Sequence, residues 1–72
     1  MRVRGQRVVV EAKDTTRMRL GTWINEAETE RLNDDAGVGM VVHKRYGHGQ
    51  AADQYVTMTL ADLVSLINGA RP

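Results

Sequence analysis

The 72-residue chain contains no cysteine, and its only aromatic residues are one tryptophan and two tyrosines. Without cysteine it can form neither a disulfide nor a thiolate metal site. Its continuous apolar runs reach three or four residues, whereas a membrane-spanning helix needs about 20. No apolar segment of signal-peptide length follows the basic N-terminal residues. These absences predict a cytoplasmic protein with no membrane partner.

Other familiar signatures are missing as well. The sequence has no Walker loop, no Rossmann fingerprint and no Ser-His-Asp set. So few aromatic residues do not favour stacking on single-stranded nucleic acid. A chain this short forms one domain over residues 1–72 and buries only about 60% of its unfolded surface. A homodimer would bury more, and we expect one.

Charge is distributed unevenly along the chain. Residues 1–20 carry six basic and two acidic side chains, and residues 21–40 carry one basic and five acidic side chains. This pattern predicts a polarised surface, although both segments could be ordinary solvated faces. Basic side chains favour nucleic acid as the partner, recognised through the shape of its backbone rather than through its bases. The candidate residues for these contacts are Arg2, Arg4, Arg7, Lys13, Arg17 and Lys44.

Hydrophobic periodicity and turn residues predict a small mixed β-sheet with helices packed on it, in the order β-α-β-β-α. We expect strands over 7–13, 38–46 and 54–60 and helices over 18–33 and 60–68. The first two strands should be parallel and the third antiparallel to the second. A short strand over 2–4, turned at Gly5, would add a hairpin and place Arg2 and Arg4 on one face. The class is α/β (α+β).

Finer predictions concern strand coverage and helix ends. The valine run over 8–10 suits a central strand covered on both faces. The first helix would end at Gly37 or Gly39, and Thr22 would cap it if it begins late. In the second helix, Thr59 and Asp62 resemble a capping pair and Gly69 a stop. The inward residues of that helix would be Leu60, Leu63, Val64 and Ile67.

Glu11 and Lys13 follow the valine run at the carboxyl end of its strand. Residues two apart in a strand project to the same face, so the two side chains should point together. A carboxylate there is a suitable ligand for Mg²⁺, and an ammonium group could stabilise charge on a phosphate under attack. The alternative is structural, because Glu-x-Lys is a common pattern.

Four stretches together resemble the PD-(D/E)xK nuclease superfamily, especially its phage-encoded, Holliday-junction-resolvase-like members. They are VVVEAK, WINEAE, AGVGMVVHKRYG and QYVTMTLADLVSLI. The resemblance extends from residue 5 onward. It implies a restriction-endonuclease-like core and a Mg²⁺- or Mn²⁺-dependent DNA endonuclease of resolvase type. Such an enzyme would act in DNA recombination, on branched or duplex DNA in the cytoplasm of a bacterial host.

The resemblance also implies roles for individual residues. Glu11 would be the metal ligand, Lys13 the catalytic lysine and Glu26 a helix residue that completes the catalytic site. Lys44 or Arg45 would contact the DNA backbone.

One departure from the family bears on activity. The family has an aspartate on the strand before the glutamate, but residues 1–10 contain no acidic side chain. Three explanations are open: the natural protein starts earlier, the site is rebuilt from Asp14, Glu26 or a second subunit, or the protein binds DNA without cutting it. The alternatives to the nuclease are therefore a non-catalytic DNA-binding or protein-interaction module, and a regulatory dimer whose acidic helix contacts a partner protein.

Other candidate residues favour structural roles. His43 and His48 have no recognised metal-ligand spacing and are expected to be exposed. Trp23 is expected in the core or in a dimer contact rather than under a base. Met18, Met40 and Met58 are expected to fill gaps in the core.

Overall fold

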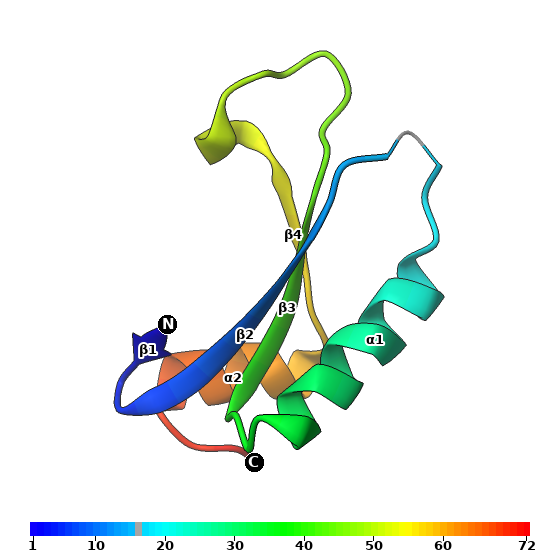
Figure 1. The fold of residues 1–72 in the computed structure, drawn as a ribbon. Helices are drawn as coiled ribbons and strands as arrows, with labels where there is room; N and C mark the ends of the chain where they lie inside the picture. Colours follow the sequence, from blue (N-terminus) through cyan, green and yellow to red (C-terminus); the bar gives the residue numbers. More distant parts are fainter. Residues whose placement is uncertain (16) are drawn as a thin grey trace.

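A computed structural model describes residues 1–15 and 17–72 and contains a four-stranded mixed sheet with two helices (Figure 1). The strand order follows the chain, β1-β2-β3-β4. The elements are β1 (Arg2–Val3), β2 (Gln6–Lys13), α1 (Leu20–Asn33), β3 (Val38–His43), a 3₁₀ turn (Ala51–Asp53), β4 (Tyr55–Thr57) and α2 (Leu60–Asn68). This confirms the predicted α+β class and element order, including the initial hairpin.

The initial hairpin turns over two residues. Strand β1 pairs antiparallel with β2 through Val3 and Gln6, and both residues between them have positive φ, 51° at Arg4 and 79° at Gly5. Such angles form the turn whose twist matches the flanking strands, and glycine adopts them without strain. The turn at Gly5 is therefore confirmed. The prediction that Arg2 and Arg4 share a strand face is wrong, because Arg4 lies in the turn.

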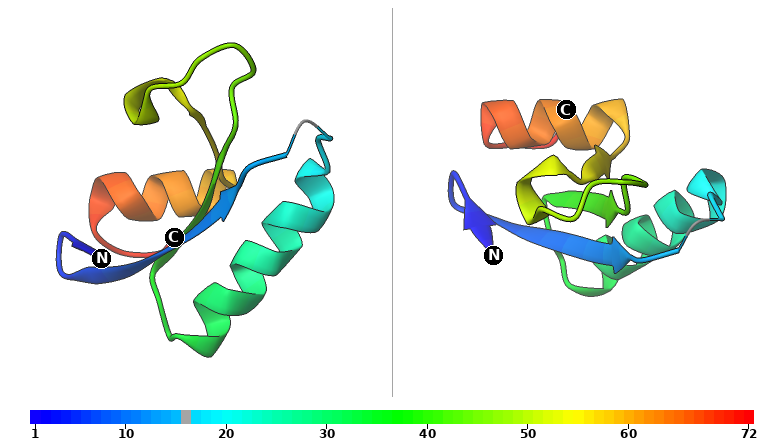
Figure 2. Two further views of the ribbon diagram at one scale, coloured as in Figure 1. Left: turned by 45° about the horizontal axis from the view of Figure 1, so that its top comes forward. Right: turned by 90° about the horizontal axis from the view of Figure 1, so that it is seen from above.

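Strands β2 and β3 are parallel, as predicted, and α1 connects them. The helices cover opposite faces of the sheet (Figure 2). On the side of α2, Val8, Val38 and Met40 are buried and Met58 and Leu66 pack against them. Because side chains alternate along a strand, Val10 shares that face with Val8. It is 44% exposed, so the prediction that the valine strand is covered on both faces is wrong at Val10.

The face of the sheet under α1 has a core of its own. Trp23 and Ala27 of α1 pack against Val41, with Ile24 beside them. The helix begins at Leu20 with Arg19 at its N-cap, so neither residue 18 nor a Thr22 cap starts it. No helix in the described part of the chain is long and apolar enough to cross a membrane.

The end of α1 corrects the predicted glycine stops. The helix ends at Asn33, and Asp35 takes the left-handed conformation at φ 52°. The amide of Ala36 then donates to the carbonyl of Arg31 at 2.8 Å, which is the bond of a Schellman end. Gly39 instead allows α1 to approach the sheet, since an added Cβ would lie 3.2 Å from the carbonyl oxygen of Ala27.

Helix α2 begins and ends as predicted but exposes the side expected to face inward. The Thr59 hydroxyl caps the amide of Asp62, and Gly69 follows the helix at φ 81°. Leu60, Leu63 and Ile67 are 75%, 41% and 59% exposed, so the prediction that they point inward is wrong.

The unpaired edge of β3 explains the reversal of α2. Strand β4 pairs only with Val41–His43, because it spans three residues instead of the predicted seven. The edge of β3 before Val41 therefore meets α2. Asp62 accepts a hydrogen bond from the Gly39 amide of this edge, and Ser65 donates one to the Gly37 carbonyl just before the strand. Both residues are buried. Buried main-chain polar groups need partners, so polar residues occupy this side of the helix.

Candidate functional site

The two residues at the end of β2 both face α1. Glu11 lies opposite Val41, and Lys13 lies opposite His43 in the parallel register. Side chains of residues paired in this way project to the same face of a sheet, and Val41 packs against Trp23 and Ala27 of α1. Glu11 and Lys13 therefore share the α1 face, as the spacing predicted. Both are half-buried.

Helix α1 brings a second carboxylate to this place. Lys13 Nζ lies 2.7 Å from Glu26 Oε2, in an ion pair whose side chains are 25% and 46% exposed. The predicted catalytic residues Lys13 and Glu26 thus meet, and Glu11 stands two positions before Lys13 on the same face. An ion pair exposed to this degree contributes at most about 1 kcal/mol. Separating Lys13 from Glu26 therefore costs little.

The donor atoms at this face fit Mg²⁺ in kind, although few of them are available. Glu11 and Glu26 offer the carboxylate oxygens that this ion prefers, and protein sites often supply only one or two carboxylates, with substrate phosphates completing the shell. Among residues 1–15 and 17–72, no group of three or more His, Asp or Glu side chains is placed to hold a metal. The residues therefore fit an ion whose coordination is completed by bound substrate.

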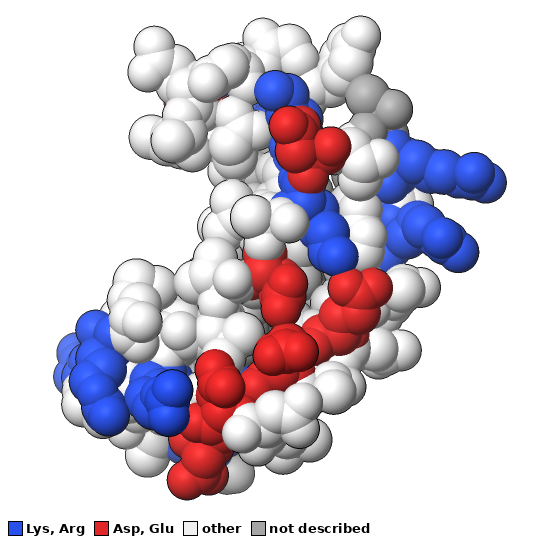
Figure 3. Space-filling model, in the orientation of Figure 1, with Lys and Arg blue, Asp and Glu red and all other residues white. Residues whose placement is uncertain are grey.

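The predicted DNA-binding residues fall into two groups rather than one patch. Arg2, Arg4 and Arg7 belong to the hairpin, whereas Lys13, Lys44 and Arg45 lie at the carboxyl ends of β2 and β3. Lys13 follows Arg7 by six positions along β2, which corresponds to about 20 Å. Figure 3 shows basic side chains at these two places and near the start of α1, which Arg17 precedes, with acidic side chains in a band between them.

His43 is buried, which makes the prediction of an exposed histidine wrong at this position. It is 4% exposed, and its Nε2 lies 2.8 Å from Thr57 Oγ1. Its ring lies between Trp23 and Tyr55, with centroids 5.3 and 5.6 Å away. The other nitrogen, Nδ1, is also buried and has no hydrogen-bond partner among the described residues.

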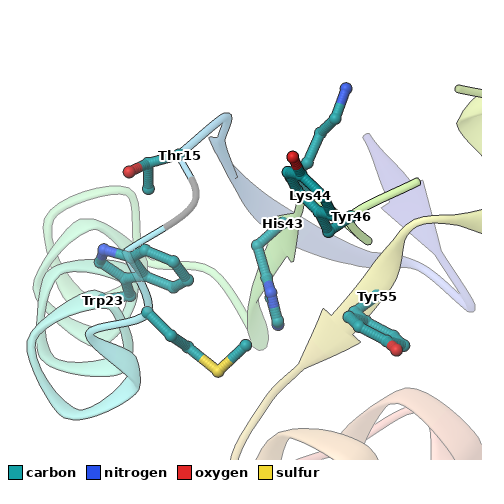
Figure 4. A pocket seen from close by; sticks show the side chains of 7 residues that line it. Thr15, Trp23, His43, Lys44, Tyr46 and Tyr55 are labelled. Carbon is teal, nitrogen blue, oxygen red and sulfur yellow. The ribbon is translucent and has the colours of Figure 1, made fainter. Parts of the chain in front are cut away.

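These rings surround a pocket of about 210 Å³ at the N-terminal end of α1 and the C-terminal end of β3 (Figure 4). Its lining residues are Thr15, Met18, Trp23, His43, Lys44, Tyr46 and Tyr55. Met18 is 57% exposed, so its predicted place in the core is wrong, whereas Met40 is buried as predicted. The individual residues gave no sign of the pocket, because its aromatic members come from separate elements.

The sequence also failed to indicate the importance of Asp62, which appeared only as part of a helix cap. Its carboxylate accepts hydrogen bonds from the Gly39 amide at 3.0 Å, the Thr59 hydroxyl at 2.8 Å and Arg71 Nη1 at 2.6 Å. Burial by itself raises the pKa of this carboxyl. The hydrogen-bond donors lower the pKa by more than burial raises it, so that it lies below its ordinary value of 3.8. Asp62 joins α2 and the chain end to the edge of β3.

No protein-family model, curated protein or solved structure matches this chain. The resemblance to PD-(D/E)xK nucleases therefore rests on the residues of the chain alone.

Proposed function

We propose that this chain is a Mg²⁺-dependent DNA endonuclease domain of the PD-(D/E)xK type, with Glu11, Lys13 and Glu26 at its site. The supporting observation is the 2.7 Å ion pair between Lys13 and Glu26, on the face and at the strand end that carry Glu11. A core-filling strand has no need of this arrangement. An ammonium group beside two carboxylates of this kind would offer partners to both a divalent ion and a phosphodiester.

Each residue has a distinct role in this proposal. Glu11, helped by Glu26, would hold the ion, which would supply positive charge at the phosphate and acidify a bound water. Lys13, once released from Glu26, donates hydrogen bonds to the phosphate oxygen that gains charge. Lys44 and Arg45 contact phosphates near the site, and Arg2, Arg4 and Arg7 contact phosphates about 20 Å away along β2. That separation corresponds to roughly six base pairs of one duplex.

A second candidate function is DNA binding without cleavage. Two observations favour it: Glu26 already neutralises Lys13, and a third acidic or histidine ligand is missing from the described part of the chain. Binding of this kind would depend on salt but not on Mg²⁺.

We also propose that the protein is a homodimer in solution. The supporting observation is the exposed apolar side of α2, where Leu60, Leu63 and Ile67 are all exposed to solvent. A contiguous apolar patch on the surface of a protein is typical of an interaction site. A second copy of the chain would cover it without any other partner.

Cleavage assays decide between the two candidate functions. We expect labelled branched or duplex DNA to be cut with Mg²⁺ and left intact with EDTA. Glu11→Gln and Lys13→Ala should abolish cutting while binding persists. Glu30→Gln is the matched control, since Glu30 is an exposed acidic residue on the same helix as Glu26. Salt-dependent binding without cutting at any Mg²⁺ or Mn²⁺ concentration would establish the second candidate in place of the first.

A further inference from the structure

The aromatic residues of this chain are few and all gather at one pocket. The sequence contains one tryptophan, two tyrosines and no phenylalanine, and all three aromatic residues line the 210 Å³ pocket with His43. They come from α1, from the segment after β3 and from β4. Figure 4 shows His43 between Trp23 and Tyr55, with the Lys44 side chain extending away from the rings.

Core packing does not account for this gathering. Trp23 and His43 are buried and form the inner wall, but Tyr46 is 82% exposed and Tyr55 47% exposed. Tyrosine rings that only stabilised the fold would be covered, because burial of apolar surface is what makes a ring stabilising. These rings instead present their surface to solvent at the mouth of a hollow.

We propose that this pocket binds an unpaired nucleobase of DNA, stacked against its aromatic walls. The inference rests on the proposed function, because it takes DNA to be the substrate. Aromatic faces bind any base by stacking and require no particular sequence. Pockets for drug-sized ligands have volumes of about 300–1,000 Å³. The smaller volume here suits a single ring system.

The charges around the pocket select a nucleotide over an uncharged ring compound. Lys44 lines the pocket, and no acidic side chain is among its described lining residues. The Lys44 amide donates to the Lys13 carbonyl at 3.1 Å, so the two lysines extend from neighbouring strand ends. Arg45 lies over the Tyr55 ring, 5.6 Å from its centre. A base in the pocket would therefore have cations close to its flanking phosphates.

The position of the pocket connects base binding to cleavage. His43, on its wall, is the parallel neighbour of Lys13, and adjacent strands lie about 4.8 Å apart. That distance is on the order of one nucleotide step. A nucleotide displaced at a branch or bulge could place its base among the rings and an adjacent phosphate at Lys13. The pocket would then make the protein select DNA with unpaired bases over continuous duplex.

The test compares binding to three labelled DNAs by fluorescence anisotropy in EDTA, so that cleavage plays no part. They are a continuous duplex, the same duplex with one bulged adenosine, and that bulge with its base removed. The wild type should bind the bulged adenosine most tightly. Tyr46→Ala should weaken that binding by roughly 5- to 150-fold, the effect of losing one stacking contact, and leave the other two DNAs unchanged. Tyr55→Leu should act in the same direction.

Two control variants separate stacking from charge and from folding. Lys44→Ala should weaken binding to all three DNAs by a similar factor, because phosphate contacts ignore the base. Leu32→Ala changes an exposed residue near the far end of α1 and should alter none of them.

The outcomes distinguish the two proposals. Equal affinity for the three DNAs, unaffected by Tyr46→Ala, would overturn the base pocket while leaving DNA binding and cleavage intact. Failure to bind any of the three at low salt would overturn the proposed function together with the pocket.

Discussion

Replacing the buried carboxylate of Asp62 by an amide tests how the two sides of this fold are joined. Asp62→Asn preserves shape and one acceptor oxygen but removes the charge. The carboxylate side chain is 2% exposed and lies 2.6 Å from Arg71, whose side chain is 30% exposed. A hydrogen bond to a charged group contributes about 1.5–3 kcal/mol and a neutral one about 0.5–1.5 kcal/mol. With partial solvent screening at Arg71, we expect a loss of about 2 kcal/mol.

That loss is large for a chain of this length. At 0.05–0.15 kcal/mol per residue, a domain of this size has a total free energy of unfolding of roughly 4–11 kcal/mol. Asp62→Ala would also leave the Gly39 amide without its acceptor. Removing one partner of a buried ion pair costs about 3–5 kcal/mol. This variant should therefore lose much or all of the free energy of unfolding of the domain. Asp62→Asn is the better probe because it leaves a folded population to measure.

Urea denaturation at several pH values provides the measurement, with fluorescence of the buried Trp23 as the signal and circular dichroism as a second probe. A slope of about 1 kcal/mol per molar urea would convert the expected loss into a midpoint shift of about 2 M at pH 7. Asp53→Asn, at an exposed position, is the control and should stay within about 0.5 kcal/mol of the wild type.

The pH dependence follows from the lowered pKa of Asp62. Its folded pKa lies below the ordinary 3.8, so its contribution to stability is complete above that value and is lost as the pH falls through the folded pKa. The difference between wild type and Asp62→Asn should be constant from neutral pH down to about pH 5 and shrink below pH 4. A variant as stable as the wild type at pH 7, or an undiminished difference at pH 3, would refute this account of Asp62.

Three further predictions test other parts of the structure. Glu26→Gln should lower the free energy of unfolding by less than about 1 kcal/mol, because the ion pair is exposed, while abolishing cleavage; urea titration and the nuclease assay on one preparation check both, and cleavage at the wild-type rate would argue against its catalytic role. Gly39→Ala should lower stability by about 1–3 kcal/mol, because its Cβ would lie 3.2 Å from the Ala27 carbonyl oxygen; thermal unfolding should show the loss, and Gly49→Ala, with open space around it, should not. Ile67→Lys should convert the proposed dimer to a folded monomer in sedimentation experiments. A wild-type protein that sediments as a monomer would contradict the dimer proposal.

Local pattern was sufficient to predict most elements, whereas the family resemblance alone suggested that Glu26 of a helix would lie near Lys13. Alternation places Glu11 and Lys13 on one face whatever surrounds the strand, and residues four apart in a helix, such as the buried Trp23 and Ala27, lie on one side of it. The Thr59 cap and the glycine after α2 were also correct, because capping depends on hydrogen bonds within a few residues of the helix end.

The orientation of α2 could not be predicted in this way. Leu60, Leu63 and Ile67 formed the apparent apolar stripe, yet the helix turns Asp62 and Ser65 inward. The reason lies in β4, whose early end leaves main-chain groups of β3 to be satisfied by side chains. The sequence around Gly39 does not show that its amide lacks a strand partner. This missing partner nevertheless determines which side of α2 is buried, because the amide must be satisfied by a side chain.

The pocket shows the same division between local and distant information. The sequence by itself shows that aromatic residues are scarce and that an acidic and a basic residue alternate at the end of a valine strand. It also predicts the order β-α-β-β-α with a possible initial hairpin, since these properties depend on composition and on neighbours along the chain. Only the packing of α1 and β4 around β3 brings Trp23 and Tyr55 to either side of His43. Contacts between residues far apart in sequence depend on how whole elements pack, and no local pattern encodes that packing.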